Sequence, residues 1–185
     1  FFCFGGAYAG TAFFFPAYFN QHRGYSMETA TAIVGISYGI GIIGYIAVAY
    51  VGEFVLTRRN TVVVWAVMGS IATICLLWLP ENQFQDMLWF GIMAAFFYGN
   101  AAALSMFMAE VFPTRVRATA AGLAGSFALN LGHATFPIIV AWGIETIGWQ
   151  WSFTIAVVPF MLIAALAILS LENIKSGLDL EEISQ

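Results

Sequence analysis

Six long stretches of this chain contain no Asp, Glu, Lys or Arg. They are residues 1–22, 29–52, 60–80, 87–109, 118–144 and 146–171. A helix needs about 20 mainly apolar residues to cross a hydrocarbon core about 30 Å thick, and each stretch reaches that length. Only 9% of all residues are charged. A soluble domain carries roughly 25%, so a soluble fold of this size would lack a polar surface.

These stretches predict an all-α integral membrane protein in which residues 1–171 form one bundle of six transmembrane helices. We expect the helices at about 1–20, 30–51, 61–79, 87–109, 118–142 and 152–171. Residues 172–185 then form an acidic cytoplasmic tail. Residue 1 is a phenylalanine inside an apolar run, so we expect the chain to be part of a longer polypeptide.

The basic residues indicate which side of the membrane each connection faces, because Lys and Arg in short connections are retained in the cytoplasm. With six helices, both ends and the second and fourth connections share one side. That side holds Arg58, Arg59, Arg115, Arg117 and Lys175, and the other side holds only Arg23. We therefore predict a multi-pass protein of the cell membrane, inner or plasma, with both ends of this segment in the cytoplasm.

The fourth connection, EVFPTRVR at 110–117, concentrates charge between two apolar runs. Phe112 precedes a proline, which favours an extended conformation, so the helix before it should end near Glu110. Arg115 and Arg117 are two positions apart and cannot share one helix face. They either contact lipid headgroups only, or join Glu110, Arg58 and Arg59 in a breakable cluster of cytoplasmic gating charges.

The same connection carries a resemblance to a family. Glu-x-Phe-Pro-Thr-x-x-Arg at 110–117, followed by ATAAGLAGS at 118–126, resembles the loop between helices 10 and 11 of the major facilitator superfamily. Within it, the chain is similar to metabolite:proton symporters and to sugar-porter-like and aromatic-acid carriers. The stretch GEFVLTRRN at 52–60 lies where the family has a second basic motif. Arg58 and Arg59 match its terminal pair, while Glu53 replaces the expected Asp at altered spacing.

The resemblance implies a fold and a function. It implies that the chain is the C-terminal half, helices 7–12, of a 12-helix secondary active transporter with a missing N-terminal six-helix half as its partner. A small organic metabolite, of the carboxylate or sugar class, would bind between the halves and cross by alternating access, with symport of protons. Glu110, Arg117, Arg58 and Arg59 would take part in cytoplasmic gating.

Polar side chains deep within the predicted helices are candidates for the substrate cavity, because such groups face the protein interior or water rather than lipid. They are Tyr8, Thr11, Tyr98, Asn100, Asn130 and His133. His133 changes charge near neutral pH if its pKa is unperturbed. Two interpretations stay open for it: a neutral side chain that donates to a backbone carbonyl or to Asn100, and a residue that binds substrate or proton.

Small residues predict where helices approach closely. Gly35 and Gly39 form a GxxxG pattern, which is typical of tight packing between transmembrane helices. Gly35-Ile-Ser-Tyr-Gly39 also matches the G-x-S-x-G pattern of hydrolases, but that pattern requires a strand before the serine and here it lies within a predicted helix.

Other classes remain alternatives: a freestanding six-helix carrier, a channel, and an intramembrane hydrolase. The sequence contains neither a TVGYG filter nor regularly spaced arginines along a helix, which are typical of potassium channels and voltage sensors. Cys3 and Cys75 lie in separate apolar runs without metal-ligand spacing. We therefore expect no enzyme activity, no cofactor, no metal site and no nucleic-acid partner, and membrane lipid as the surrounding medium.

Overall fold

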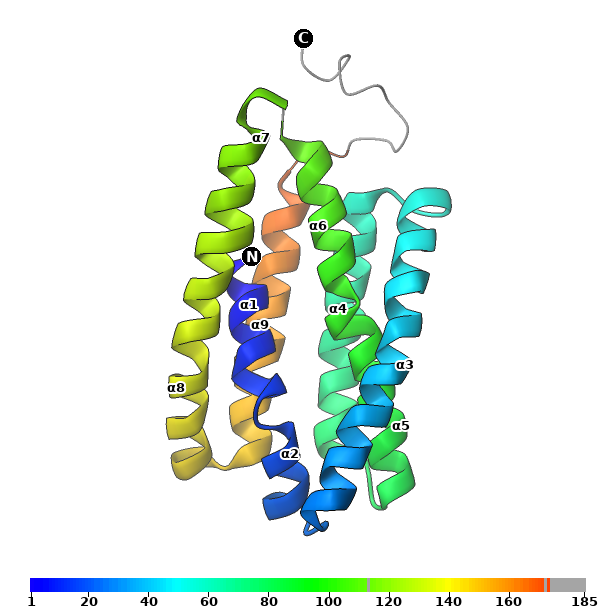
Figure 1. Cartoon of the computed structure of the whole chain (residues 1–185), viewed down its shortest axis with the longest axis vertical. Helices are drawn as coiled ribbons and strands as arrows, with labels where there is room; N and C mark the ends of the chain where they lie inside the picture. Colours follow the sequence, from blue (N-terminus) through cyan, green and yellow to red (C-terminus); the bar gives the residue numbers. More distant parts are fainter. Residues whose placement is uncertain (113, 172, 174–185) are drawn as a thin grey trace.

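The computed structural model describes residues 1–112, 114–171 and 173, and every regular element among them is helical (Figure 1). Three short segments are π-helical and carry the label η. The elements are α1 (Phe2–Ala12), α2 (Phe15–Ala17), η1 (Tyr18–His22), α3 (Met27–Phe54), α4 (Arg58–Trp78), α5 (Gln83–Met93), η2 (Ala94–Tyr98), α6 (Asn100–Val111), α7 (Thr114–Ala120), η3 (Ala121–Ala128), α8 (Leu129–Ile147) and α9 (Trp149–Leu169).

Five continuous helices in the described residues are long and apolar enough to cross a membrane. They span Met27–Phe54, Arg58–Trp78, Gln83–Val111, Thr114–Ile147 and Trp149–Leu169. This confirms the coarse prediction of an all-α, multi-pass membrane protein. All five begin before the predicted first residues, because capping residues such as Ser26 and Thr57 start the helices in the polar flanks. α4 and α9 end slightly before their predicted last residues, at Trp78 and Leu169.

The first predicted helix differs from the expectation, because it is interrupted. α1 ends at Ala12, and the chain restarts as α2 and η1 after Phe13 and Phe14. Pro16 lies in the first turn of α2, where the missing amide hydrogen removes no helical hydrogen bond. A continuous helix would instead place the proline ring against the preceding turn. The segment 1–22 is therefore a broken helix.

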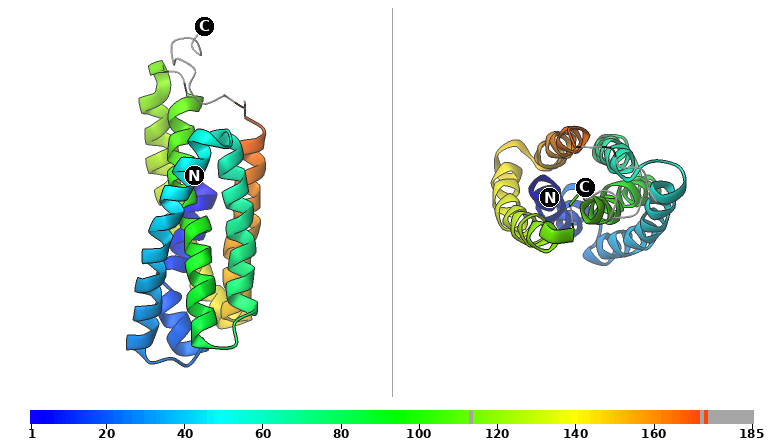
Figure 2. Two further views of the ribbon diagram at one scale, coloured as in Figure 1. Left: turned by 90° about the vertical axis from the view of Figure 1, so that its right-hand side faces the viewer. Right: turned by 90° about the horizontal axis from the view of Figure 1, so that it is seen from above.

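The six helical segments pack in two interlocking groups of three. Segment 1 comprises α1, α2 and η1, segment 4 comprises α5, η2 and α6, and segment 5 comprises α7, η3 and α8, while segments 2, 3 and 6 are α3, α4 and α9. Segment 1 contacts segments 5 and 6 through α1, and segment 4 contacts segments 2 and 3. α4 and α9, segments 3 and 6, join the two groups, as the end-on view in Figure 2 shows. Exchanging the first three segments with the last three maps this contact pattern onto itself. The bundle thus has an internal pseudo-two-fold arrangement.

Glycines allow the closest helix contacts in both groups. A Cβ atom on Gly132 of α8 would overlap the backbone of α1 at Phe2 and Gly6, and one on Gly44 of α3 would overlap the backbone of η2 at Ala95. At Gly35 and Gly39, by contrast, an added Cβ atom would meet nothing within 4 Å. The GxxxG prediction is therefore wrong within this bundle, because these two glycines lie on the opposite face of α3 from its packed glycines.

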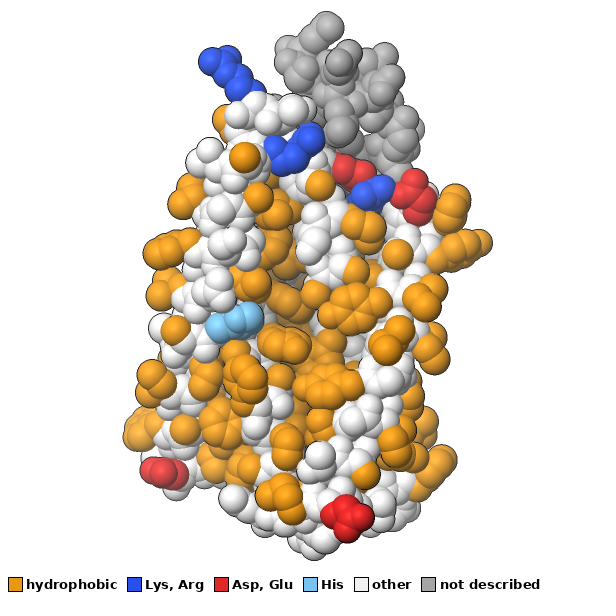
Figure 3. All heavy atoms as spheres, viewed as in Figure 1, with side chains coloured by type: hydrophobic (Ala, Val, Ile, Leu, Met, Phe, Trp, Pro, Cys, Tyr) orange, Lys and Arg blue, Asp and Glu red, His pale blue; other side chains and the backbone are white. Residues whose placement is uncertain are grey.

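Apolar side chains cover the outside of the bundle along most of its height. Figure 3 shows one such face, with Lys and Arg gathered at the end that carries α7 and acidic groups at both ends. Ile43, Ile138 and Leu166 are 65%, 73% and 67% exposed. Exposed aliphatic side chains on this scale are costly in water and favourable in lipid. The surface agrees with a bilayer as the surrounding medium.

Candidate functional site

Three of the predicted cavity residues meet near the middle of the bundle. The ring of Tyr8 on α1 lies 5.0 Å from that of Tyr98 on η2 and 5.9 Å from that of His133 on α8. Tyr38 on α3 completes the group, with its ring 5.3 Å from Tyr98. Four segments thus contribute one side chain each. We call Tyr8, Tyr38, Tyr98 and His133 the central cluster.

The π-helical turn η2 positions Tyr98. The amide of Gly99 donates to the carbonyl of Ala94 at 3.3 Å, five residues back, which widens the helix at this point. Gly99 also lies against the backbone of Gly44. A wider turn changes which residues face the neighbouring helices. Here it directs Tyr98 towards α1 and α3, and it includes Ala94 and Ala95, the residues that lie closest to the glycines of α3.

The central cluster offers polar atoms without a fixed charge. Tyr98 is only 3% exposed, while Tyr8, Tyr38 and His133 are half-buried. Phenol hydroxyls both donate and accept hydrogen bonds, and a neutral imidazole has one donor and one acceptor nitrogen. His133 makes no hydrogen bond to a carbonyl or to Asn100 within the described residues. Its contact with Tyr8 leaves its nitrogens free for a ligand.

The other three predicted cavity residues lie elsewhere. Thr11 is fully buried and donates to the carbonyl of Ala7 in its own helix at 2.8 Å. Asn130 is exposed, and its amide donates to the carbonyl of Ser126 at 2.8 Å. Both side chains satisfy backbone groups one turn away. Neither side chain belongs to the central cluster, and their assignment to the substrate cavity stays a prediction.

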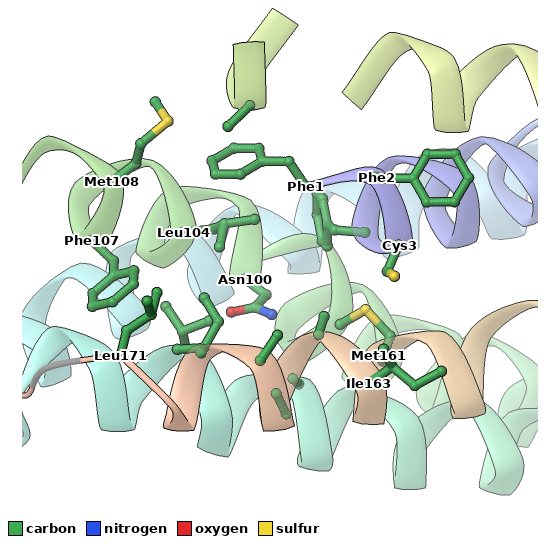
Figure 4. Close-up of a pocket in the computed structure, with 18 of the residues that line it drawn as sticks. Phe1, Phe2, Cys3, Asn100, Leu104, Phe107, Met108, Met161, Ile163 and Leu171 are labelled. Atoms are coloured by element: carbon green, nitrogen blue, oxygen red, sulfur yellow. The ribbon is translucent and has the colours of Figure 1, made fainter. Parts of the chain in front are cut away.

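Asn100 faces a separate cavity of about 280 Å³. The side chain points between Leu104 and Met161 (Figure 4), and the remaining wall is almost entirely apolar. Asn100 is 3% exposed, and its Oδ1 atom has no hydrogen-bond partner among the described residues. The cavity lies among α1, α4, α6 and α9. Asn100 enters it although it follows Tyr98 by only two residues in the sequence. Asn100 is therefore not part of the central cluster.

Arg58 links three helix ends at the predicted cytoplasmic side. Its Nη2 lies 2.6 Å from the Glu53 carboxylate at the end of α3, and its Nε lies 2.9 Å from the Glu110 carboxylate near the end of α6. Arg58 and Glu110 are 19% exposed and Glu53 is 44% exposed. We call these three residues the inner cluster. Its partial exposure allows water to compete for each carboxylate.

The other predicted gating charges do not enter this cluster. Arg59 donates to the carbonyls of Leu169 and Leu171, at 3.4 and 2.9 Å, and so caps the C-terminal end of α9. Arg117 donates to the carbonyl of Phe112 at 3.3 Å. Arg115 is exposed and forms no ion pair with a described residue. Phe112 is extended, as predicted, with ψ of 129°. Lys175 and Pro113 lie outside the described residues.

Comparisons with known proteins add no identification. No protein-family model matches the sequence, and no curated protein matches it either.

Proposed function

We propose that this chain is one half of a major facilitator superfamily transporter, the half formed by helices 7–12. The supporting observation is the contact pattern of the six segments, in which the first three and the last three are interchangeable. Because each set of three segments crosses the membrane an odd number of times, the last three segments are inverted relative to the first three. Inverted three-helix repeats of this kind are the internal architecture of each half of such transporters.

The proposed substrate site is the central cluster. Its four residues come from α1, α3, η2 and α8, on the side of the bundle where Figure 1 displays α8, α1, α6 and α3 in front of α9 and α4. We place the second six-helix half against that side. A small organic metabolite then binds near mid-membrane between the halves. The hydroxyl groups and the imidazole of the cluster offer hydrogen-bond donors and acceptors to the substrate.

His133 is the proposed link between transport and protons. An imidazole side chain can accept a proton at one ring nitrogen and donate one from the other. Protonation would also provide the cation that a carboxylate substrate requires, whereas a sugar needs only hydrogen bonds. The proposal is therefore proton-coupled symport, with a carboxylate or a sugar as cargo.

The inner cluster is the proposed cytoplasmic gate. Arg58 joins the ends of segments 2, 3 and 4 through two carboxylates, and separating these ends requires both contacts to break. Partly exposed ion pairs contribute only about 0–1 kcal/mol each, so an alternating conformational change can break and reform them. With this end in the cytoplasm, the cluster stabilises one of the two conformations. The proposed location is the cell membrane, and no catalytic step is involved.

Uptake measurements on the complete protein test the proposal. Proteoliposomes are supplied with labelled carboxylates and sugars in turn, at two proton gradients, and the transported compound is then used to compare variants. His133→Ala should reduce uptake and remove its pH dependence. Thr146→Ala is the matched control, because this exposed side chain on the same helix bonds only to carbonyls of its own helix. Unchanged uptake and pH dependence in the His133 variant would remove the assigned site.

A further inference from the structure

A second cluster of charged side chains lies at the opposite end of the bundle from Arg58, and it is more deeply buried than the inner cluster. The Nε of Arg23, just after η1, lies 3.3 Å from Oδ1 of Asp86 in the first turn of α5. The hydroxyl of Tyr25 donates to Oδ2 of Asp86 at 2.6 Å. The connection between segments 1 and 2 is thus joined directly to the start of segment 4.

Arg23 also reaches the end of segment 3. Its Nη1 donates to the carbonyl of Pro80 at 3.1 Å and its Nη2 to that of Leu76 at 3.3 Å. These carbonyls lie at and just beyond the C-terminal end of α4, where the helix dipole favours a cation. Asp86 lies at an N-terminal end, where the dipole favours an anion. Each charge is therefore stabilised by its helix end as well as by its partner.

Burial makes this pair different from the inner cluster. The Asp86 side chain is 1% exposed and Arg23 is 18% exposed, whereas Glu53 in the inner cluster is 44% exposed. Removing one partner of a buried pair leaves an uncompensated charge out of contact with water, which is strongly unfavourable. Water cannot replace Arg23 beside Asp86 as it can replace Arg58 beside Glu53.

Tyr25 remains a hydrogen-bond donor throughout the physiological range. Burial, followed by the hydrogen bond to Asp86, raises the pKa of Tyr25 to about 12. The nearby His22 has a pKa lowered by burial and then by the adjacent Arg23, which favours its neutral form. Arg23 additionally lies 5.7 Å from the centre of the Tyr18 ring. Among the groups around Asp86, Arg23 therefore carries the compensating charge.

The interrupted first segment explains why such a connection matters. α2 has three residues and η1 has five, so helical hydrogen bonds alone do not tie this part of the chain to α1. Aromatic packing adds a second attachment, since the ring of Phe15 lies 4.5 Å from Phe90 on α5 and 5.2 Å from Phe153 on α9. The polar contacts of Arg23 fix the end of the segment beyond these rings.

We infer that Arg23, Tyr25 and Asp86 form an outer clasp, which fixes the broken end of segment 1 to segments 3 and 4. The clasp keeps the outer end of the bundle together as one body. It does not depend on the proposed transport function, although in a transporter it would stay closed while the inner cluster opens.

Amide hydrogen exchange tests the clasp on the full chain in lipid nanodiscs. Asp86→Asn and Arg23→Gln should each accelerate exchange of the amides at 15–25 and 79–88 by about tenfold, because a buried charge loses its partner. The double variant should exchange more slowly than Arg23→Gln alone, since it leaves no buried charge without a partner. Glu110→Gln is the control at the inner end and should leave these amides unchanged.

Two results would overturn the inference. One is exchange at 15–25 that stays within about twofold of the unmodified chain in both single variants. The other is equal acceleration of these amides by Glu110→Gln. If neither Asp86→Asn nor Arg23→Gln folds, Tyr25→Phe removes a single hydroxyl and should accelerate the same amides by about threefold. Unchanged exchange in that variant contradicts the clasp as well.

Discussion

Gly132 and Gly35 allow a paired test of the helix packing, because the same substitution meets opposite surroundings. In Gly132→Ala the new methyl group would lie 2.6 Å from the backbone nitrogen of Gly6 and 3.2 Å from the carbonyl carbon of Gly5. These are backbone atoms, so α1 and α8 must move apart to accommodate it. At Gly35 no atom lies within 4 Å of the new methyl position.

The expected magnitudes follow from these contacts. Overpacking of a well-packed region costs about 1–3 kcal/mol, and we place Gly132→Ala near 2 kcal/mol because rigid backbone must shift. Gly35→Ala should instead stabilise the helix by up to about 1 kcal/mol, since alanine is the better helix former. For a chain of this length about 1 kcal/mol corresponds to roughly 2–4 °C in Tm. Gly132→Ala should thus lower Tm by about 4–8 °C.

Thermal unfolding of the purified protein in detergent, followed by circular dichroism and by an environment-sensitive thiol dye, measures both variants. The reasoning about the α1–α8 contact is refuted if Gly35→Ala destabilises the protein as much as Gly132→Ala does. It is refuted equally if Gly132→Ala leaves Tm unchanged.

Three further substitutions test other contacts. In uptake assays Glu110→Gln should change the rate more than Glu53→Gln, because Glu53 is 44% exposed and Glu110 is 19% exposed; equal effects would contradict unequal coupling to Arg58. Asn100→Leu should leave Tm unchanged or raise it by a few degrees, because an unpartnered buried oxygen is replaced by an apolar group of similar size; a clear drop in Tm would contradict an apolar cavity. Arg59→Ala should cost about 0.3–1 kcal/mol in the unfolding free energy, since it uncaps the C-terminal end of α9, and full stability would show that this cap is not formed.

The positions of the membrane helices were predictable because hydropathy depends on composition alone. The rotation of each helix was not, since lipid and protein interior are both apolar and a transmembrane helix need not show a single apolar face. For this reason the sequence pointed to Gly35 and Gly39, whereas Gly44 and Gly132 make the contacts. The break after α1 depends on Pro16, whose presence permits a kinked helix as well as an interrupted one.

The same limit applies to the candidate site. Depth within an apolar run identified Tyr8, Tyr98 and His133, and the structure brings them together. Depth could not separate them from Asn100 and Thr11, which point elsewhere, and it would also have identified Tyr38 if every tyrosine near mid-span had been considered.

Asp86 was missed because it precedes a long apolar run and has the appearance of an ordinary residue in a connection. In its buried position its charge is compensated by Arg23, which lies 63 positions earlier in the sequence. No local pattern signals a contact over that separation.

Alternating access to the central cluster is the claim on which the proposed function depends, and cysteine labelling measures it directly. Cys3 and Cys75 are first replaced in the complete protein, and a single cysteine is introduced at His133 or, as a lipid-facing control, at Ile138, which is 73% exposed. A membrane-impermeant maleimide is then applied from either side of oriented vesicles. The account predicts that the cysteine at position 133 reacts from both sides, while the one at 138 does not react. Failure of position 133 to react from either side would contradict it.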